Sequence, residues 1–187
     1  VSKTFSLEKI FPLVDYGHLD YGENKVQEAI DKWKETKDKK PKIKLHLIGK
    51  LQTNKVKFAL KIFDYIHSVD NRKLAKKIAD EETKQGKKIK IFLQVNIGNE
   101  DQKSGVDKNE LIDLYNYCNE LNLNIVGLMC IPPATEEPNI YFKEMNLINN
   151  KLNLSELSMG MSSDYLKAVE NYSTYLRIGS SIFGNRN

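Results

Sequence analysis

The sequence has 187 residues, of which 40% are hydrophobic and 29% charged, and its formal net charge is +4. Such a composition indicates a globular protein of one domain, and a chain of this length can bury a sizeable core. The 29 basic residues nearly balance the 25 acidic ones, so the charge does not require nucleic acid as a partner, and an anionic small ligand would fit as well. No apolar run reaches membrane length, and no signal peptide opens the chain.

The two cysteines, Cys118 and Cys130, lack the spacing of a CxxC motif. This pattern predicts neither a disulfide framework nor a zinc site, and it favours a reducing compartment, which we take to be the cytoplasm. Residues 1–4 lack an initiator methionine and resemble a strand that begins midway. We therefore expect that a preceding N-terminal segment is missing.

Hydrophobic patterning predicts strands and helices in regular alternation along the chain. Strands are expected at residues 1–2, 19–21, 45–48, 65–69, 90–95, 125–130, 156–159 and 175–178. Helices are expected at residues 6–14, 26–36, 54–60, 71–85, 107–121, 140–152 and 164–170.

Alternation of this kind is typical of a parallel sheet, and eight such units predict a closed (β/α)8 barrel. We expect this TIM barrel to be a single domain spanning residues 1–187. An open doubly wound sheet is the alternative, but the chain has no GxGxxG motif after an early strand.

The last predicted strand runs directly into a Gly-Ser-Ser turn. Because side chains alternate along a strand, Tyr175, Arg177 and Gly179 are expected on one face. Residues 179–181 can offer backbone N–H groups and hydroxyls to a phosphate. Taken alone, the stretch is better explained as a buried strand with Arg177 in a salt bridge, because structural ion pairs are common.

In a (β/α)8 barrel, chemistry lies at the carboxyl ends of the strands, and a phosphate site is frequently formed by the last two loops. Here those loops contain Gly160, Ser162, Gly179 and Ser180. Lys3 follows the first strand. Alone it would be an ordinary solvated lysine, but a reactive amine beside a phosphate site and a basic group suggests pyridoxal 5′-phosphate.

Other candidate residues are better explained without a role in chemistry. His46 lies inside the third predicted strand, and no carboxylate partner is evident for it, so we interpret it as a satisfied core or mouth histidine. Met129, Met159 and Met161 are interpreted as packing residues. No metal site is predicted.

Eight motifs in order resemble the pyridoxal-phosphate homeostasis proteins (the YggS/PROSC family), which are similar to the N-terminal barrel of alanine racemase. The motifs are VSKT (1–4), YGENKVQE (21–28), HLIGKLQTNK (46–55), IHSVD (66–70), QVNIGNEDQKSG (94–105), GLMCIPP (127–133), LSMGMSSD (157–164) and RIGSSIFG (177–184).

This resemblance implies a role for each matching residue. Lys3 is the Schiff-base lysine and Asn24 lies near the cofactor. The phosphate is held by Ser162, Gly179 and Ser180. Arg177 faces the pyridine nitrogen, where a fixed cation disfavours ring protonation and weakens the cofactor as an electron sink.

The resemblance implies a carrier that maintains vitamin B6 homeostasis by holding the cofactor and passing it to apoenzymes. The carrier would have no catalytic residues and would be a monomer or weak dimer.

The alternative is an amino-acid racemase, which needs a second acid/base on the opposite face of the ring. In alanine racemase a tyrosine from a C-terminal domain, expected to be absent here, completes that site. His46 or Tyr165 would be substitutes. A nucleic-acid binder has only the net charge in its support, so no nucleic acid or membrane partner is expected.

Overall fold

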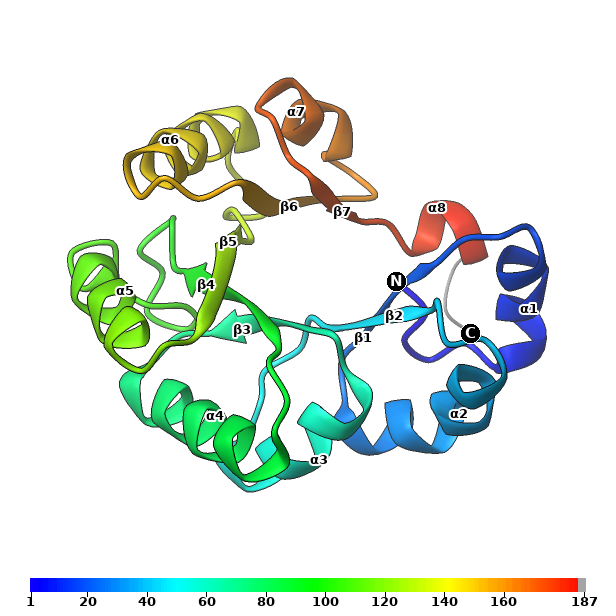
Figure 1. Cartoon of the computed structure of the whole chain (residues 1–187). Coiled ribbons are helices and arrows are strands. Elements are labelled where there is room, and N and C mark those ends of the chain that lie inside the picture. Colours follow the sequence, from blue (N-terminus) through cyan, green and yellow to red (C-terminus); the bar gives the residue numbers. More distant parts are fainter. Residues whose placement is uncertain (185–187) are drawn as a thin grey trace.

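The computed structural model describes residues 1–184; residues 185–187, the end of the predicted domain 1–187, lie outside this range. Within it, seven parallel strands form one sheet, in which each strand pairs with the next along the chain. The sheet curls into a nearly closed barrel with helices around its outside (Figure 1). The α/β fold class and the TIM-barrel architecture are thus confirmed.

The strands are β1 (Asp20–Glu23), β2 (Lys44–Leu47), β3 (Tyr65–Val69), β4 (Lys90–Val95), β5 (Asn124–Cys130), β6 (Glu156–Met161) and β7 (Tyr175–Arg177). The helices are α1 (Leu7–Asp15), α2 (Val26–Lys39), α3 (Val56–Ile62), α4 (Arg72–Gln85), α5 (Leu111–Glu120), α6 (Pro138–Lys151), α7 (Tyr165–Glu170) and α8 (Ser180–Phe183), with a short 3-10 helix η1 (Thr53–Lys55) before α3. The bounds of β3 and β4 agree with the prediction.

Both faces of β3 and β4 are buried, which explains their nearly continuous hydrophobic sequences. In β4, Ile91 and Leu93 belong to the large cluster between the sheet and the helices. Phe92, which points the opposite way, packs with Tyr65 and Met129 inside the barrel. The strands therefore separate an outer apolar core from an inner layer.

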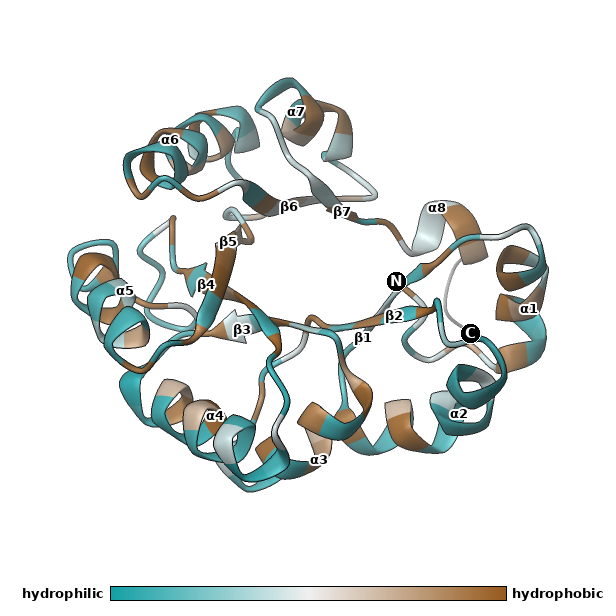
Figure 2. Ribbon diagram, viewed as in Figure 1, coloured by the Kyte–Doolittle hydropathy of each residue, from teal (hydrophilic) through white to brown (hydrophobic). Residues whose placement is uncertain are grey.

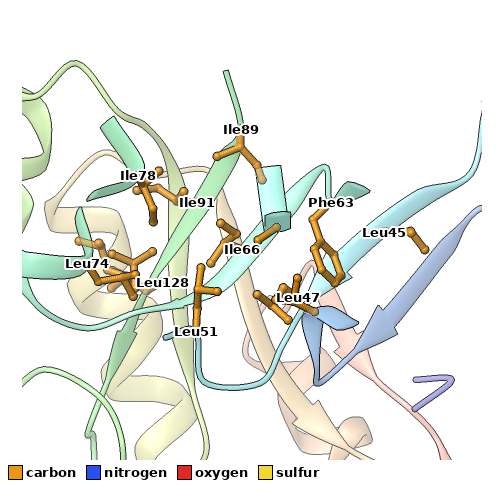
Figure 3. Close-up of a cluster of buried hydrophobic side chains, with 14 of the residues drawn as sticks. Leu45, Leu47, Leu51, Phe63, Ile66, Leu74, Ile78, Ile89, Ile91 and Leu128 are labelled. Atoms are coloured by element: carbon orange, nitrogen blue, oxygen red, sulfur yellow. The ribbon is translucent and has the colours of Figure 1, made fainter. Parts of the chain in front are cut away.

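The outer core joins strand and helix side chains. Figure 3 shows Leu45, Leu47, Ile66 and Ile91 of the strands together with Leu74 and Ile78 of α4. In Figure 2, β4 and β5 are mostly hydrophobic, whereas the outer turns of α2 and α4 are mostly hydrophilic. Each helix thus covers the barrel with its apolar side.

Helix α4 illustrates how local sequence sets an element's ends. The side chain of Asn71 accepts a hydrogen bond of 2.9 Å from the backbone N–H of Leu74, as an N-cap residue should. Gly86 ends the helix in the left-handed conformation, with φ of 61°. Both ends agree closely with the predicted helix at residues 71–85.

The predicted first strand, residues 1–2, is not a strand in the structure. Two residues cannot form a ladder, but each makes one hydrogen bond across the gap between β7 and β1. The N–H of Ser2 donates to the carbonyl of Gly22 at 3.0 Å, and the amino group of Val1 donates to the carbonyl of Ile178. This segment occupies the position of the eighth strand.

Helix α5 begins four residues later than predicted. Val106 forms a single parallel bridge with Val95, which draws the chain toward β4. The carboxylate of Asp107 then accepts a hydrogen bond of 2.7 Å from the N–H of Asn109. This local turn competes with helical bonding, as aspartate commonly does outside helix interiors.

A buried carboxylate fastens the beginning of the chain to the barrel. Oε1 of Glu23, a fully buried residue, accepts hydrogen bonds from Ser2 Oγ at 2.8 Å, Lys32 Nζ at 2.9 Å and Trp33 Nε1 at 2.9 Å. Lys32 also donates to the backbone carbonyl of Ser2. The cluster ties the residue before Lys3 to β1 and α2 together.

We expect Glu23→Ala to lower the free energy of unfolding by about 3 to 5 kcal/mol, because it leaves buried donors and the Lys32 charge without their acceptor. Urea denaturation measures this loss. The matched control is Glu28→Ala, which removes an exposed carboxylate paired with Lys25 and should change stability by about 0.5 kcal/mol or less. Equal effects of the two substitutions would contradict the role assigned to Glu23.

Candidate functional site

One cavity of about 370 Å³ contains all six residues that the sequence predicts for the cofactor: Lys3, Asn24, Ser162, Arg177, Gly179 and Ser180. It lies at the carboxyl ends of the strands, where (β/α)8 barrels place their sites. Asn24 follows β1, Ser162 follows β6, and Arg177 ends β7. The two ends of the described chain therefore meet at one site.

The cavity has an apolar wall and a few polar groups, a composition typical of small-molecule sites. The apolar residues lining it are Val1, Phe5, Ile48, Ile131 and Met161. The lining side chains include two cationic groups, Lys3 and Arg177, and no carboxylate among the described residues. An anionic ligand with a flat apolar body suits such a lining.

Arg177 is buried, with 7% of its surface exposed. Its Nη1 donates to the carbonyl oxygen of Ser158 at 2.6 Å and to Ser158 Oγ at 2.9 Å, and its Nη2 donates to the carbonyl of Cys130 at 2.8 Å. Among the described residues these partners replace the salt bridge that was the alternative interpretation. Burial lowers the pKa of Arg177, and Asp164 partly opposes this effect through its charge.

Backbone N–H groups converge on Ser162 in the loop after β6. Its Oγ accepts from the N–H of Gly179 at 3.3 Å and from the N–H of Ser181 at 3.5 Å. Both contacts are long for hydrogen bonds, so these donors are weakly engaged. An anionic oxygen would be a stronger acceptor for them than a hydroxyl.

Asn24 is held in place because its backbone lies very close to the backbone of Gly49. A Cβ atom built on Gly49 would lie 2.3 Å from the carbonyl oxygen of Asn24, so no larger residue fits there without displacing it. The carbonyl of Gly49 accepts in turn from Ser68 Oγ at 2.7 Å. A glycine after β2 thus sets the position of a residue after β1.

Lys3 lies in a tight turn that is closed by a hydrogen bond from the N–H of Phe5 to the carbonyl of Ser2 at 3.2 Å. Thr4, in the same turn, has φ of 68°, a left-handed conformation that is unfavourable for a β-branched residue. Strain of this kind clusters at functional sites. The turn and the Glu23 cluster before it together position the lysine.

His46 is buried and hydrogen-bonded, in agreement with its interpretation as a satisfied core histidine, but the structure corrects one premise of that interpretation. A carboxylate partner exists, because His46 Nε2 lies 3.0 Å from Asp20 Oδ1. The spacing along the chain hides this contact, since the two residues lie on neighbouring strands, near the amino ends of the barrel. Neither His46 nor Tyr165 lines the cavity that contains Lys3. Met129 and Met159 are fully buried packing residues, as predicted, whereas Met161, for which the same role was predicted, is exposed and lines the cavity.

The sequence-based predictions did not include the buried residues that hold the site residues in position. Ser158 contacts the guanidinium of Arg177, and Glu23 holds Ser2. The sequence does contain a signal that could have identified both residues, because Ser158 lies in an apolar strand and Glu23 directly precedes Asn24. A polar residue at a buried strand position usually has a specific partner.

The residues of the range 1–184 support neither a metal site nor a reactive thiol. No group of three or more His, Cys, Asp or Glu side chains in this range could hold a metal ion. Cys118 and Cys130 are both buried and unbridged, and burial raises the pKa of each thiol to about 12. Such thiols are inert.

None of the helices in the described part of the chain combines the length and the apolar character that crossing a membrane requires.

Comparison with known proteins places the chain in a family. The family model described as the alanine racemase N-terminal domain matches residues 3–187. The pyridoxal phosphate homeostasis protein of Aquifex aeolicus is 38% identical over 195 residues, covering 99% of this chain and 85% of that protein. The corresponding protein of Pasteurella multocida is 34% identical over 197 residues, covering all of this chain and 84% of its own length.

Solved structures agree with this assignment. PipY of Synechococcus elongatus, solved with PLP bound, superposes with a TM-score of 0.90 at 35% identity, covering 98% of this chain and 90% of that one. An alanine racemase of Clostridium difficile shares the fold with a TM-score of 0.75 at 14% identity, covering 96% of this chain and 48% of that one. The chain therefore belongs to the alanine racemase N-terminal domain family and, within it, to the pyridoxal phosphate homeostasis proteins.

Proposed function

We propose that this protein binds pyridoxal 5′-phosphate in the cavity at the carboxyl ends of the strands and acts as a carrier that maintains the supply of the cofactor. The observation that supports this most strongly is the convergence of Lys3, Arg177 and the loops after β6 and β7 on one cavity of about 370 Å³. The PLP bound in the similar PipY structure and the name of the similar Aquifex aeolicus protein agree with it.

The residues fit the cofactor's chemical groups. The cofactor supplies an aldehyde that condenses with a primary amine, and Lys3 is the lysine that lines the cavity. Ser162, Gly179 and Ser180 would hold the phosphate through hydroxyl and backbone N–H donors. Asn24 would contact the ring from the β1 side.

Arg177 would face the pyridine nitrogen. A buried guanidinium held by two backbone carbonyls cannot easily move away, so it keeps a positive charge at that point. A fixed cation disfavours protonation of a neighbouring nitrogen. The ring would then withdraw electrons poorly, which suits storage of the cofactor better than carbanion chemistry.

A carrier without catalysis is favoured over a racemase by the lining of the cavity. Racemisation by two bases requires a second acid/base opposite Lys3. The suggested substitutes, His46 and Tyr165, do not line this cavity.

We further propose that the whole chain, residues 1–187, acts as one cofactor-binding domain in the cytoplasm. It delivers the cofactor to apoenzymes, and it is a monomer or weak dimer.

The decisive experiment traps the covalent bond. Purified protein is incubated with pyridoxal phosphate and reduced with borohydride, and the modified peptide is identified by mass spectrometry. We expect the adduct on Lys3 and none in Lys3→Ala. The control Lys50→Ala removes an exposed lysine outside the cavity and should leave the adduct intact. An adduct on another lysine in the native protein would refute the assignment.

The same loaded protein should not interconvert L- and D-alanine at a rate above that of free pyridoxal phosphate, because the residues of the range 1–184 that line the cavity include no His, Tyr, Asp or Glu that could act as a second base. Chiral chromatography of the reaction mixture measures this. Turnover that disappears in Lys3→Ala would show that the protein is an enzyme and that the carrier proposal is wrong.

Gly49→Ala should weaken cofactor binding by about tenfold, since the new methyl group displaces the backbone of Asn24. Fluorescence titration measures the dissociation constant. Gly86→Ala is the control: it has open space around it but a positive φ, so it should lower stability by about 1 to 2 kcal/mol and leave the affinity unchanged. Equal affinities in the two variants would exclude Asn24 from the site.

A further inference from the structure

A chain of hydrogen-bonded side chains crosses the barrel interior and ends on Arg177. Asp20 Oδ1 lies 3.0 Å from His46 Nε2, and His46 Nδ1 lies 3.0 Å from His67 Nε2. His67 Nδ1 lies 2.8 Å from Ser158 Oγ, which accepts from Arg177 Nη1 at 2.9 Å. The proposed cofactor role does not by itself explain why His46, His67 and Ser158 are buried in such a series of contacts.

The chain of contacts is well shielded from water except at one end. His46, His67 and Ser158 have exposed fractions of 4%, 1% and 0%. The side chain of Asp20, at the amino end of β1, is 42% exposed. The line therefore runs from solvent at one end of the barrel to a buried cation at the other.

Packing fixes the planes of both imidazole rings. His46 stacks on Tyr65 with the ring centres 4.2 Å apart and the planes at 10°. His67 stacks on Phe92 at 4.2 Å and 21°. Rings held in this way keep their nitrogens directed at the same partners.

The end groups determine the direction of the hydrogen bonds. Arg177 can only donate and the Asp20 carboxylate can only accept. Burial and the positive charge of Arg177 keep the pKa of His67 well below its ordinary value, so His67 is neutral. If each ring carries its proton on Nε2, every contact has one donor and one acceptor, running from Arg177 to Asp20.

We infer that Asp20, His46, His67 and Ser158 are positioning residues that hold the Arg177 guanidinium in one orientation toward the cofactor cavity. This inference rests on the proposed function only in naming the ligand that Arg177 faces. Arg177 also lines a second cavity of about 330 Å³, together with Asp20, His46 and His67, so without these contacts it has space in which to turn away.

The first test does not require the cofactor. Side-chain 15N NMR of the cofactor-free protein at neutral pH should show a proton on Nε2 of both His46 and His67, with His67 neutral, and the signals are assigned by substituting each histidine. The exposed His18 provides an internal reference. A ring protonated on Nδ1, or a cationic His67, would overturn the inference.

The second test measures the effect on the ligand. Ser158→Ala removes the hydroxyl link but keeps the backbone carbonyl that also holds Arg177. It should weaken pyridoxal phosphate binding by about fivefold and shift the absorbance maximum of the bound cofactor. Asp20→Asn, at the exposed end, should shift the spectrum in the same direction with little risk to folding.

The control is Asp15→Asn, which alters an exposed aspartate paired with Lys40 and should change neither quantity. A double-mutant cycle between Ser158→Ala and Arg177→Lys should show coupling, because both act on one orientation. Additive effects, or an unchanged spectrum in both Ser158→Ala and Asp20→Asn, would overturn the inference. Failure of the proposed function is distinguishable, since the native protein would then form no adduct on Lys3.

Discussion

The site depends on one buried carboxylate. Glu23 lies on the helix-facing side of β1 and binds Ser2 on one side and Trp33 and Lys32 of α2 on the other. This interaction adds to the backbone hydrogen bonds of Val1 and Ser2 and to the packing of the buried Phe5 in joining the segment that carries Lys3 to the barrel. A buried charge is costly when it loses a partner, so the cluster favours the one arrangement in which Ser2, Lys32 and Trp33 all reach Glu23 Oε1.

The outer core and the barrel interior contribute differently to the structure: the first stabilises the fold, and the second orients a side chain. Between sheet and helices, Leu, Ile and Val side chains exclude water and make the assembly stable. Inside the barrel, the rings of His46 and His67 stack on aromatic neighbours and take part in hydrogen bonds that end on Arg177. These contacts set the direction in which the Arg177 guanidinium points. Stability and orientation are thus supplied by opposite faces of the same strands.

Much of this structure follows from periodic patterns that a sequence displays openly. The strands at residues 65–69 and 90–95 were predicted with correct bounds, since both combine β-branched or aromatic residues with short apolar runs. The six residues that we propose for the cofactor line one cavity because a (β/α)8 barrel brings all strand ends to one rim.

Contacts between single side chains were not predictable in the same way. The pairing of Asp20 with His46 depends on strand register, and that of Ser158 with His67 joins residues 91 positions apart. The start of α5 was missed because a turn at Asp107 outweighed helix propensity. Such features require the three-dimensional positions of both partners, which composition and spacing do not supply.

The order of the strands has a consequence for folding. Each strand pairs with its neighbour in the sequence, so most of the sheet can grow through local steps. The contacts of Val1 with Ile178 and of Phe5 with Phe183 instead join distant parts of the sequence, and closing so long a loop carries an entropic cost. That closure also brings Lys3 beside Gly179 and Ser180. Closing the barrel therefore also completes the cavity, and a ligand bound there would stabilise the contact between the segment before β1 and the segment after β7.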